Sequence, residues 1–260
     1  MELKATDVVV RLSRKDIVKQ ASLQVKGRQF VGLLGPNGSG KTTLLKSVYR
    51  VLKPASGIIT LDDTDISRLP HRESAKRMGV VSQFTNMSFD FTVEEVVLMG
   101  RAPHKKALSR DTAEDFQIVE DSLRRVNMLE FRDCSFLTLS GGEKQRILLA
   151  RTLAQQVDMM ILDEPTNHLD IKYQIQIMDV VKSLNIGVLA ALHDLNLTLM
   201  YCDYVYVMKD GCVVAHGCPE QIITPELIRE VYEVDCDVMR HPKTGKLNVV
   251  YFSQNERGLT

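Results

Sequence analysis

The chain has 260 residues, 44% of them hydrophobic and 25% charged, which is enough to form a sizeable core without cross-links. Lysine plus arginine and aspartate plus glutamate total 33 each, and the resulting net charge of zero excludes a global attraction to nucleic acid or anionic lipid. The five cysteines are odd in number and form no CxxC pair, which argues against a disulfide framework and against a zinc site.

Apolar runs in the sequence are far shorter than the roughly 20 residues that a membrane helix needs. The opening residues MELKATD also lack the apolar core of a signal peptide. We therefore expect a soluble, cytoplasmic protein whose role at a membrane, if it has one, requires a partner.

The first quarter of the chain predicts strands with one helix. Residues 3–25 hold two β-rich runs around the charged turn 13–16, which favours an antiparallel hairpin. Residues 30–34 are a short apolar run stopped by glycine, as in a buried strand. A helix is expected over residues 41–51 and a further strand over 58–61.

The middle of the chain, about residues 84–157, predicts a helical insert. Thr92 with Glu95 and Asp111 with Glu114 are spaced as capping boxes that open helices. Strand-like runs follow at residues 159–162, 188–192 and 205–208, separated by amphipathic stretches at 171–184 and 195–201.

The last part of the chain predicts a small extension over about residues 218–260. Thr224 and Pro225 are typical of a helix start, and residues near 243–245 favour a turn between short strands. We expect these strands to pack on the domain rather than to form a regulatory tail. The whole chain, residues 1–260, is expected to be a single domain.

A phosphate-binding loop is predicted between the strand at 30–34 and the following helix. The pattern GxxxxGK[ST] is met by Gly35, Pro36, Asn37, Gly38, Ser39, Gly40, Lys41 and Thr42, with Thr43 beside it. Glycines let backbone N–H groups surround phosphate oxygens, and the helix N-terminus adds positive charge. Lys41 would reach the β- and γ-phosphates of ATP, and Thr42 would bind Mg²⁺.

Two adjacent carboxylates follow the apolar run at residues 159–162. Asp163 and Glu164 would lie at the carboxyl end of a strand, where open α/β sheets bind ligands. Such acids are often only solvated loop residues. Next to a phosphate loop, however, Asp163 becomes a candidate Mg²⁺ ligand and Glu164 a candidate general base for the attacking water.

A second candidate anion site lies at Ser140, Gly141 and Gly142. Ser140 and Glu143 form a capping box, so the plain interpretation is a helix start. Two glycines in the first turn nevertheless weaken a helix by about 1 kcal/mol each. A helix N-terminus whose backbone an anion approaches closely explains the two glycines better.

Together, GPNGSGKT, LSGGE and ILDEP resemble the ABC-transporter ATPase family over about residues 3–216. The resemblance implies an α/β P-loop NTPase core with a mixed sheet, an N-terminal antiparallel β-subdomain and an inserted α-helical subdomain. It also implies that Gln83 is the Q-loop glutamine, which touches metal and water and reports to the membrane subunit. His193 corresponds to the switch histidine that contacts the γ-phosphate, and Asp170 to an interface residue of the D-loop.

The same resemblance implies a homodimer in which Ser140 and Gly142 complete the phosphate site of the other subunit. The implied cofactors are ATP and Mg²⁺. The implied partners are an integral membrane permease and, indirectly, a substrate-binding protein, with no nucleic acid. The protein would then be peripheral, on the cytoplasmic face of the inner membrane.

Residues 98–104, LMGRAPH, resemble importer subunits for ferric siderophores, haem or cobalamin, as do residues 192–196 and 215–220. A proline-terminated helix end is the structural alternative for the first segment. The alternative function is a soluble ABC ATPase acting on ribosomes or DNA, although such proteins usually carry two cassettes or a coiled-coil insert. A catalytically inactive regulatory module is disfavoured by the residues Lys41, Asp163, Glu164, Gln83 and His193. The identity of the chelate is not encoded in an ATPase subunit.

One position departs from the family pattern. Members commonly stack adenine on an aromatic residue after the first strand, where this chain has Leu12, and no aromatic precedes Phe30. An aromatic stack contributes about 1–3 kcal/mol per base, so weaker ATP affinity or looser base selectivity is expected unless Arg11 or Arg14 covers the ring.

Overall fold

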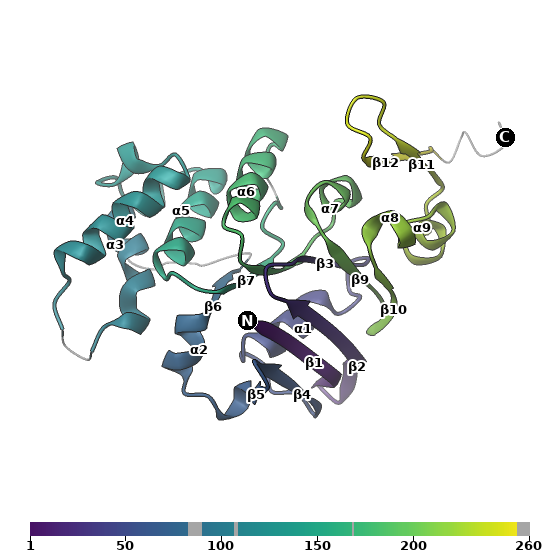
Figure 1. Cartoon of the computed structure of the whole chain (residues 1–260), viewed down its shortest axis with the longest axis horizontal. Helices are drawn as coiled ribbons and strands as arrows, with labels where there is room; N and C mark the ends of the chain where they lie inside the picture. Colours follow the sequence, from purple (N-terminus) through teal and green to yellow (C-terminus); the bar gives the residue numbers. More distant parts are fainter. Residues whose placement is uncertain (83–89, 107–108, 168, 254–260) are drawn as a thin grey trace.

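A mixed β-sheet at the centre of the molecule separates the N-terminal strands from most of the helices (Figure 1). The computed structural model describes residues 1–82, 90–106, 109–167 and 169–253. The strands are β1 (Glu2–Leu12), β2 (Lys15–Lys26), β3 (Phe30–Leu34), β4 (Ser56–Leu61), β5 (Thr64–Asp65), β6 (Met78–Val81), β7 (Met159–Asp163), β8 (Gly187–Ala191), β9 (Tyr204–Lys209), β10 (Cys212–Gly217), β11 (Cys236–Arg240) and β12 (Leu247–Tyr251).

The α-helices are α1 (Lys41–Val48), α2 (His71–Arg77), α3 (Val93–Leu98), α4 (Ala113–Arg125), α5 (Gly141–Ala154), α6 (Ile171–Ser183), α7 (Leu195–Tyr201), α8 (Pro219–Ile222) and α9 (Pro225–Tyr232). Short 3₁₀ helices are η1 (Ile66–Arg68), η2 (Met99–His104), η3 (Leu129–Phe131) and η4 (Phe136–Thr138). No helix among the described residues combines the length and the apolar character needed to cross a membrane.

The central sheet has the strand order β10-β9-β3-β8-β7-β6. Strands β9, β3, β8, β7 and β6 pair in parallel, and only β10 is antiparallel to its neighbour β9. The carboxyl ends of the parallel strands therefore meet at one edge. The loop after β3, the acids at the end of β7 and the histidine after β8 all emerge there.

A smaller antiparallel sheet, of order β2-β1-β4-β5, lies on one side of the central sheet (Figure 1). The predicted hairpin is confirmed, with Ser13 and Arg14 between β1 and β2. Helix α1 lies between the two sheets: its Leu44, Leu45 and Val48 are fully buried in a core shared by β1, β2 and the central strands.

Strand β3 shows how one short segment serves two cores. Phe30 and Leu34 belong to the core under the helices, whereas Val31 and Leu33 belong to the core around α1. This alternation follows from the two-residue period of a strand, and burial on both faces explains the continuous apolar run in the sequence.

Helices α3, α4 and α5 pack together at one end of the molecule, within the segment predicted as a helical insert (Figure 1). The capping box at Thr92 and Glu95 is confirmed. The one predicted at Asp111 and Glu114 is wrong by one residue, because Thr112 caps α4 and pairs with Asp115.

The shift at the start of α4 has a physical reason. The Asp115 carboxylate accepts N–H bonds from the Thr112 backbone at 3.0 Å and from Arg101 Nε at 2.9 Å, and both members of the ion pair are almost fully buried. This long-range ion pair selects the register, and the proximity of Arg101 helps to hold the pKa of Asp115 at about 2 although burial opposes the shift.

Other differences from the predictions are local. The first helix ends at Val48 rather than at residue 51, and the left-handed Arg50 follows it at φ 66°. Strands β5 and β6 and helix α2 were not predicted. Thr224 caps α9 as predicted, and short strands flank residues 243–245 as predicted. The boundaries given for the insert and the extension stay predictions.

Candidate active site

The phosphate loop connects β3 to α1, and its glycines are required by its geometry. Gly35 has φ 144°, and a Cβ there would lie 2.2 Å from the Met208 carbonyl oxygen. Gly40, at φ 101°, immediately precedes the first residue of α1. The loop therefore approaches β9 more closely than any side chain would permit.

Lys41 is buried within this loop, with 4% of its surface exposed. Its ammonium group donates hydrogen bonds to the carbonyls of Gly35 at 2.7 Å and Pro36 at 3.0 Å. Burial lowers the pKa of Lys41, and the charges of Glu164 and Asp163 oppose that shift. A positive charge is thus held at the centre of a loop whose backbone suits an anion.

Asp163 lies at the end of β7 and connects the acidic pair there to the phosphate loop. Its Oδ1 accepts a hydrogen bond of 3.0 Å from the Thr42 hydroxyl, although 121 residues separate them in the chain. Only 2% of Asp163 is exposed, and burial raises the pKa of its carboxyl while the Thr42 hydrogen bond lowers it. A hydroxyl and a carboxylate, both hard oxygen donors, therefore face each other beside the phosphate loop.

Glu164 follows Asp163 and is held by two side chains. His193 Nε2 lies 2.5 Å from Oε1, and because a carboxylate only accepts hydrogen bonds, the ring nitrogen donates. Asn167 Nδ2 donates to Oε2 at 2.5 Å. The backbone of Glu164 is left-handed at φ 54°, a conformation that costs on the order of 1–3 kcal/mol and that the surrounding contacts must maintain.

A small cavity of about 140 Å³ lies between the phosphate loop and Glu164. Its lining residues are Ile17, Asn37, Gly38, Gly40, Lys41, Thr42, Thr43 and Glu164. The cavity brings the predicted phosphate-binding residues and the predicted base to one place. Sequence reasoning missed Ile17, because no motif marks this position near the start of β2.

The glycine pair at the start of α5 lies apart from this cavity. Ser140 and Glu143 form the predicted capping box. None of Ser140, Gly141 and Gly142 lines the cavity among the described residues. A Cβ added at Gly141 would face open space, and one added at Gly142 would contact the side chains of Leu169 and Tyr173.

Of the remaining predicted residues, Gln83 and Asp170, the structure describes only Asp170. Gln83 lies outside the described residues, but β6 ends just before it and pairs with β7 up to Leu162, so the chain leaves the sheet next to Asp163. Asp170 is exposed and precedes the first residue of α6.

The family model described as "ABC transporter" matches residues 18–167, which is more than half of the chain. The chain belongs to the ABC transporter family. The fold class predicted for an ABC cassette, with its mixed sheet and N-terminal antiparallel sheet, is confirmed.

Two curated relatives are similar along most of the chain. The cobalamin import ATP-binding protein BtuD of Halobacterium salinarum is 37% identical over 96% of this chain, which spans 63% of that protein's length. The ferric enterobactin transport ATP-binding protein FepC of Escherichia coli is 34% identical over 95% of this chain and 93% of its own. The first is an import protein by name, and the second is a transport protein by name.

A solved structure of a metal-chelate type ABC transporter in an inward-facing conformation has a similar fold. The TM-score is 0.84, with 23% identity over 97% of this chain and 98% of the other. At this identity the likeness concerns the arrangement of the ABC cassette and not its cargo.

Proposed function

We propose that the chain is the ATP-hydrolysing subunit of an ABC importer, and that it powers uptake of a metal chelate through a separate membrane permease. The observation that carries this proposal is the Glu164 carboxylate, held by His193 and Asn167 at the edge of the cavity that Lys41 also lines. The names of the cobalamin and ferric enterobactin relatives support a ferric siderophore, haem or cobalamin as cargo.

In the proposed reaction the phosphate loop binds ATP, and Glu164 takes the proton of the attacking water. Lys41 balances the charge of the β- and γ-phosphates, and His193 keeps the carboxylate directed toward the cavity. Asn167 holds the second carboxylate oxygen, so the base has one orientation before water enters. Gln83 is assigned to the water and to communication with the permease.

We also assign Mg²⁺ to this site, with Thr42, Asp163 and Gln83 as the residues that would hold it. The paired hydroxyl and carboxylate oxygens of Thr42 and Asp163 fit a cation that prefers oxygen ligands. When bound, the ion neutralises phosphate charge. Burial raises the pKa of the Asp163 carboxyl, and the hydrogen bond from Thr42 opposes this rise and so favours the ionised form that would bind the ion.

The proposal includes a head-to-tail homodimer. Ser140 and Gly142 do not line the cavity of their own chain, and the helix start that they form is exposed or half-buried. A second copy could bring its own helix start to the phosphates and supply the missing anion contacts. ATP would then hold the two subunits together, and hydrolysis would release them.

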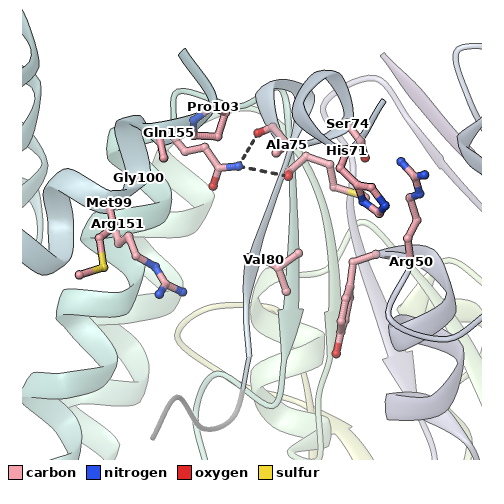
Figure 2. A pocket seen from close by; sticks show the side chains of 13 residues that line it. Arg50, His71, Ser74, Ala75, Val80, Met99, Gly100, Pro103, Arg151 and Gln155 are labelled. Atoms are coloured by element: carbon pink, nitrogen blue, oxygen red, sulfur yellow. Dashed lines mark hydrogen bonds between the residues drawn. The ribbon is translucent and has the colours of Figure 1, made fainter. Parts of the chain in front are cut away.

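The permease is proposed to dock in a cavity of about 440 Å³ between α2–β6 and η2–α5 (Figure 2). Val80 of β6 lines the cavity, and β6 pairs with β7 up to Leu162, the residue before Asp163, so docking would act on the site through this pair of strands. Met99, Ala102 and Pro103 supply apolar surface. Arg50 and Arg151 are the charged residues in its described lining, which also holds the titratable His71 and Tyr49, so a complementary segment should carry a carboxylate.

Docking can be tested with Met99→Lys. Met99 lines the cavity and is 38% exposed, so the substitution should be accommodated while adding positive charge and removing apolar contact. We expect recovery of the permease with the tagged subunit to fall at least about tenfold, while ATP turnover by the isolated chain stays unchanged. Phe116→Lys, on the 41% exposed Phe116 of α4, is the matched control and should keep the permease bound. Full recovery with Met99→Lys would contradict docking at this cavity.

The function itself is tested by recovering Glu164→Gln protein from cells with ATP present. An integral membrane permease and a chelate-binding protein should accompany it, in keeping with a peripheral position on the cytoplasmic face of the inner membrane. Recovery of ribosomes or DNA in place of the permease would support the alternative, a soluble ABC ATPase.

Base recognition gives a further prediction. Leu12 ends β1 and is 39% exposed, and Arg11 is engaged by Asp16 with Nε 2.6 Å from Oδ1. An added aromatic face at Leu12→Tyr should tighten ATP binding at least about fivefold, since base stacking contributes about 1–3 kcal/mol. Titration with a fluorescent ATP analogue measures this, with Leu137→Tyr as an exposed control. Equal affinities of Leu12→Tyr and the parent would contradict the prediction.

A further inference from the structure

The hairpin of β11 and β12 lies against α7, the helix that follows His193 (Figure 1). The two strands pair only with each other among the described strands. Val249 of β12 is 3% exposed and belongs to the core under the helices. The hairpin is thus packed on the catalytic domain at the helix nearest to the proposed switch residue.

At the start of α7, one side chain, Asn196, hydrogen-bonds the backbone of the hairpin twice. Asn196 Oδ1 accepts the Val249 N–H at 2.8 Å, and Asn196 Nδ2 donates to the Val249 carbonyl at 3.2 Å. The amide therefore satisfies both backbone groups of an edge strand, as a neighbouring strand would. Asn196 itself is half-buried in the first turn of α7.

The same turn is connected to His193. Asp194 caps α7, and its Oδ1 accepts the N–H groups of Asn196 at 2.7 Å and of Leu197 at 2.9 Å. On the other side, the Leu192 N–H donates to the Leu33 carbonyl at 3.1 Å, which fixes the chain to β3. His193 lies between these two anchors, and Asn196 ties the second anchor to the hairpin.

The other end of this C-terminal segment reaches the phosphate loop. Tyr232 ends α9, and burial raises the pKa of its hydroxyl, a rise that the nearby Gly35 backbone opposes without forming a hydrogen bond of standard geometry. Arg229 and Asp235 form an ion pair of 2.6 Å between α9 and the chain leading to β11. The segment therefore lies against both the loop that would bind phosphate and the helix that follows the switch histidine.

We propose that the β11–β12 hairpin sets the position of His193 against Glu164, with Asn196 as the positioning residue. The inference rests on the role proposed above for His193. A hairpin displaced from α7 would leave the first turn of that helix with its Asp194 cap and its buried Leu195 and Leu197, but without the two hydrogen bonds between Asn196 and the hairpin. The His193 contact with Glu164, at 2.5 Å, would then be maintained in fewer molecules.

The test compares Asn196→Ala with Lys246→Ala in the full chain. Alanine is a better helix former than asparagine, so α7 itself is not weakened by the first substitution. Lys246 is exposed and donates to the Met200 carbonyl near the last turn of α7, at 2.8 Å, so its loss removes a hairpin contact remote from His193. We expect Asn196→Ala to lower kcat about tenfold with KM for ATP unchanged, and Lys246→Ala to keep the parent kcat.

A second comparison separates positioning from a general loss of stability. When His193→Ala is already present, adding Asn196→Ala should change kcat less than about twofold, because the residue to be positioned is gone. Parent-like kcat in Asn196→Ala, even with a lowered Tm, would overturn the inference. So would a tenfold loss that persists in the His193→Ala background.

Amide hydrogen exchange distinguishes the role proposed for the hairpin from the role proposed above for His193. In Asn196→Ala the amide of Leu197 should exchange faster than in the parent, whereas Lys246→Ala should leave it unchanged. Undiminished turnover in His193→Ala would contradict the role of His193 itself. If amide exchange in Asn196→Ala is unchanged, the hairpin does not stabilise the first turn of α7, and the inference is contradicted whatever the rate of ATP hydrolysis.

Discussion

Glu164→Gln should bind ATP with the affinity of the parent and lose turnover by about 100-fold to 10,000-fold, the range associated with a general base. The amide has the shape of the carboxylate but accepts a proton far less readily. In the structure the carboxylate is held from both sides, by His193 Nε2 and Asn167 Nδ2 at 2.5 Å each. Its orientation is therefore set before substrate binds, and the substitution removes chemistry more than shape.

Phosphate release and equilibrium ATP binding measure the two halves of this prediction. Glu120→Gln is the matched control, because Glu120 lies on α4 in an exposed pair with Arg124, and it should keep parent turnover. Turnover within about threefold of the parent in Glu164→Gln would assign the base to another group. Loss of ATP binding would point to a structural role for the carboxylate.

The variant Gly142→Asp should lose ATP turnover, although Gly142 does not line the cavity of its own chain. A Cβ at Gly142 would lie 3.5 Å from Leu169 and 3.7 Å from Tyr173, so a side chain fits without strain. The added carboxylate would repel phosphate from the start of α5, and we expect at least about a 100-fold loss, comparable with removal of an oxyanion donor.

Ala113→Asp is the matched control for this charge. It places the same carboxylate in the first turn of α4, where an acid favours the helix dipole, and it should leave turnover unchanged. Circular dichroism and Tm verify that both variants fold. Parent-like turnover in Gly142→Asp would show that the glycine pair serves only the helix start.

Motifs of contiguous sequence marked most of the residues that make up the candidate site. The phosphate loop, the two acids and the glycine pair each owe their geometry to local chain constraints, chiefly φ and helix capping. The structure places Gly35 at φ 144° and forms the capping box of Ser140 with Glu143. Local rules of this kind are readable without knowing the fold.

Contacts between distant residues were not predictable in the same way. Glu164 and His193 are 29 residues apart and meet because β7 and β8 are parallel neighbours. The family resemblance gave His193 a role but did not give its contact with Glu164, and nothing in the sequence paired Asn196 with Val249. Such pairs depend on strand order and on how the hairpin packs.

Local signals also failed where a long-range contact outweighed them. Asp111 with Glu114 and Thr112 with Asp115 have the same capping spacing, and the spacing alone does not choose between them. The buried ion pair of Asp115 with Arg101, at 2.9 Å, selects the second register. It also gives Arg101 a structural role in the segment that resembles chelate importers, since Arg101 Nη1 donates to the Ala154 carbonyl at 2.8 Å as well.

The dimer with shared sites is tested most directly by mixing two inactive variants, Lys41→Ala and Gly142→Asp. Each homodimer carries a defect in both sites, whereas a mixed dimer has one site with both defects and one with neither. Random pairing of equal amounts should restore about a quarter of the parent turnover, since half of the dimers are mixed and each has one intact site. Turnover of the mixture no higher than the mean of the two variants alone would contradict a site completed by the second subunit.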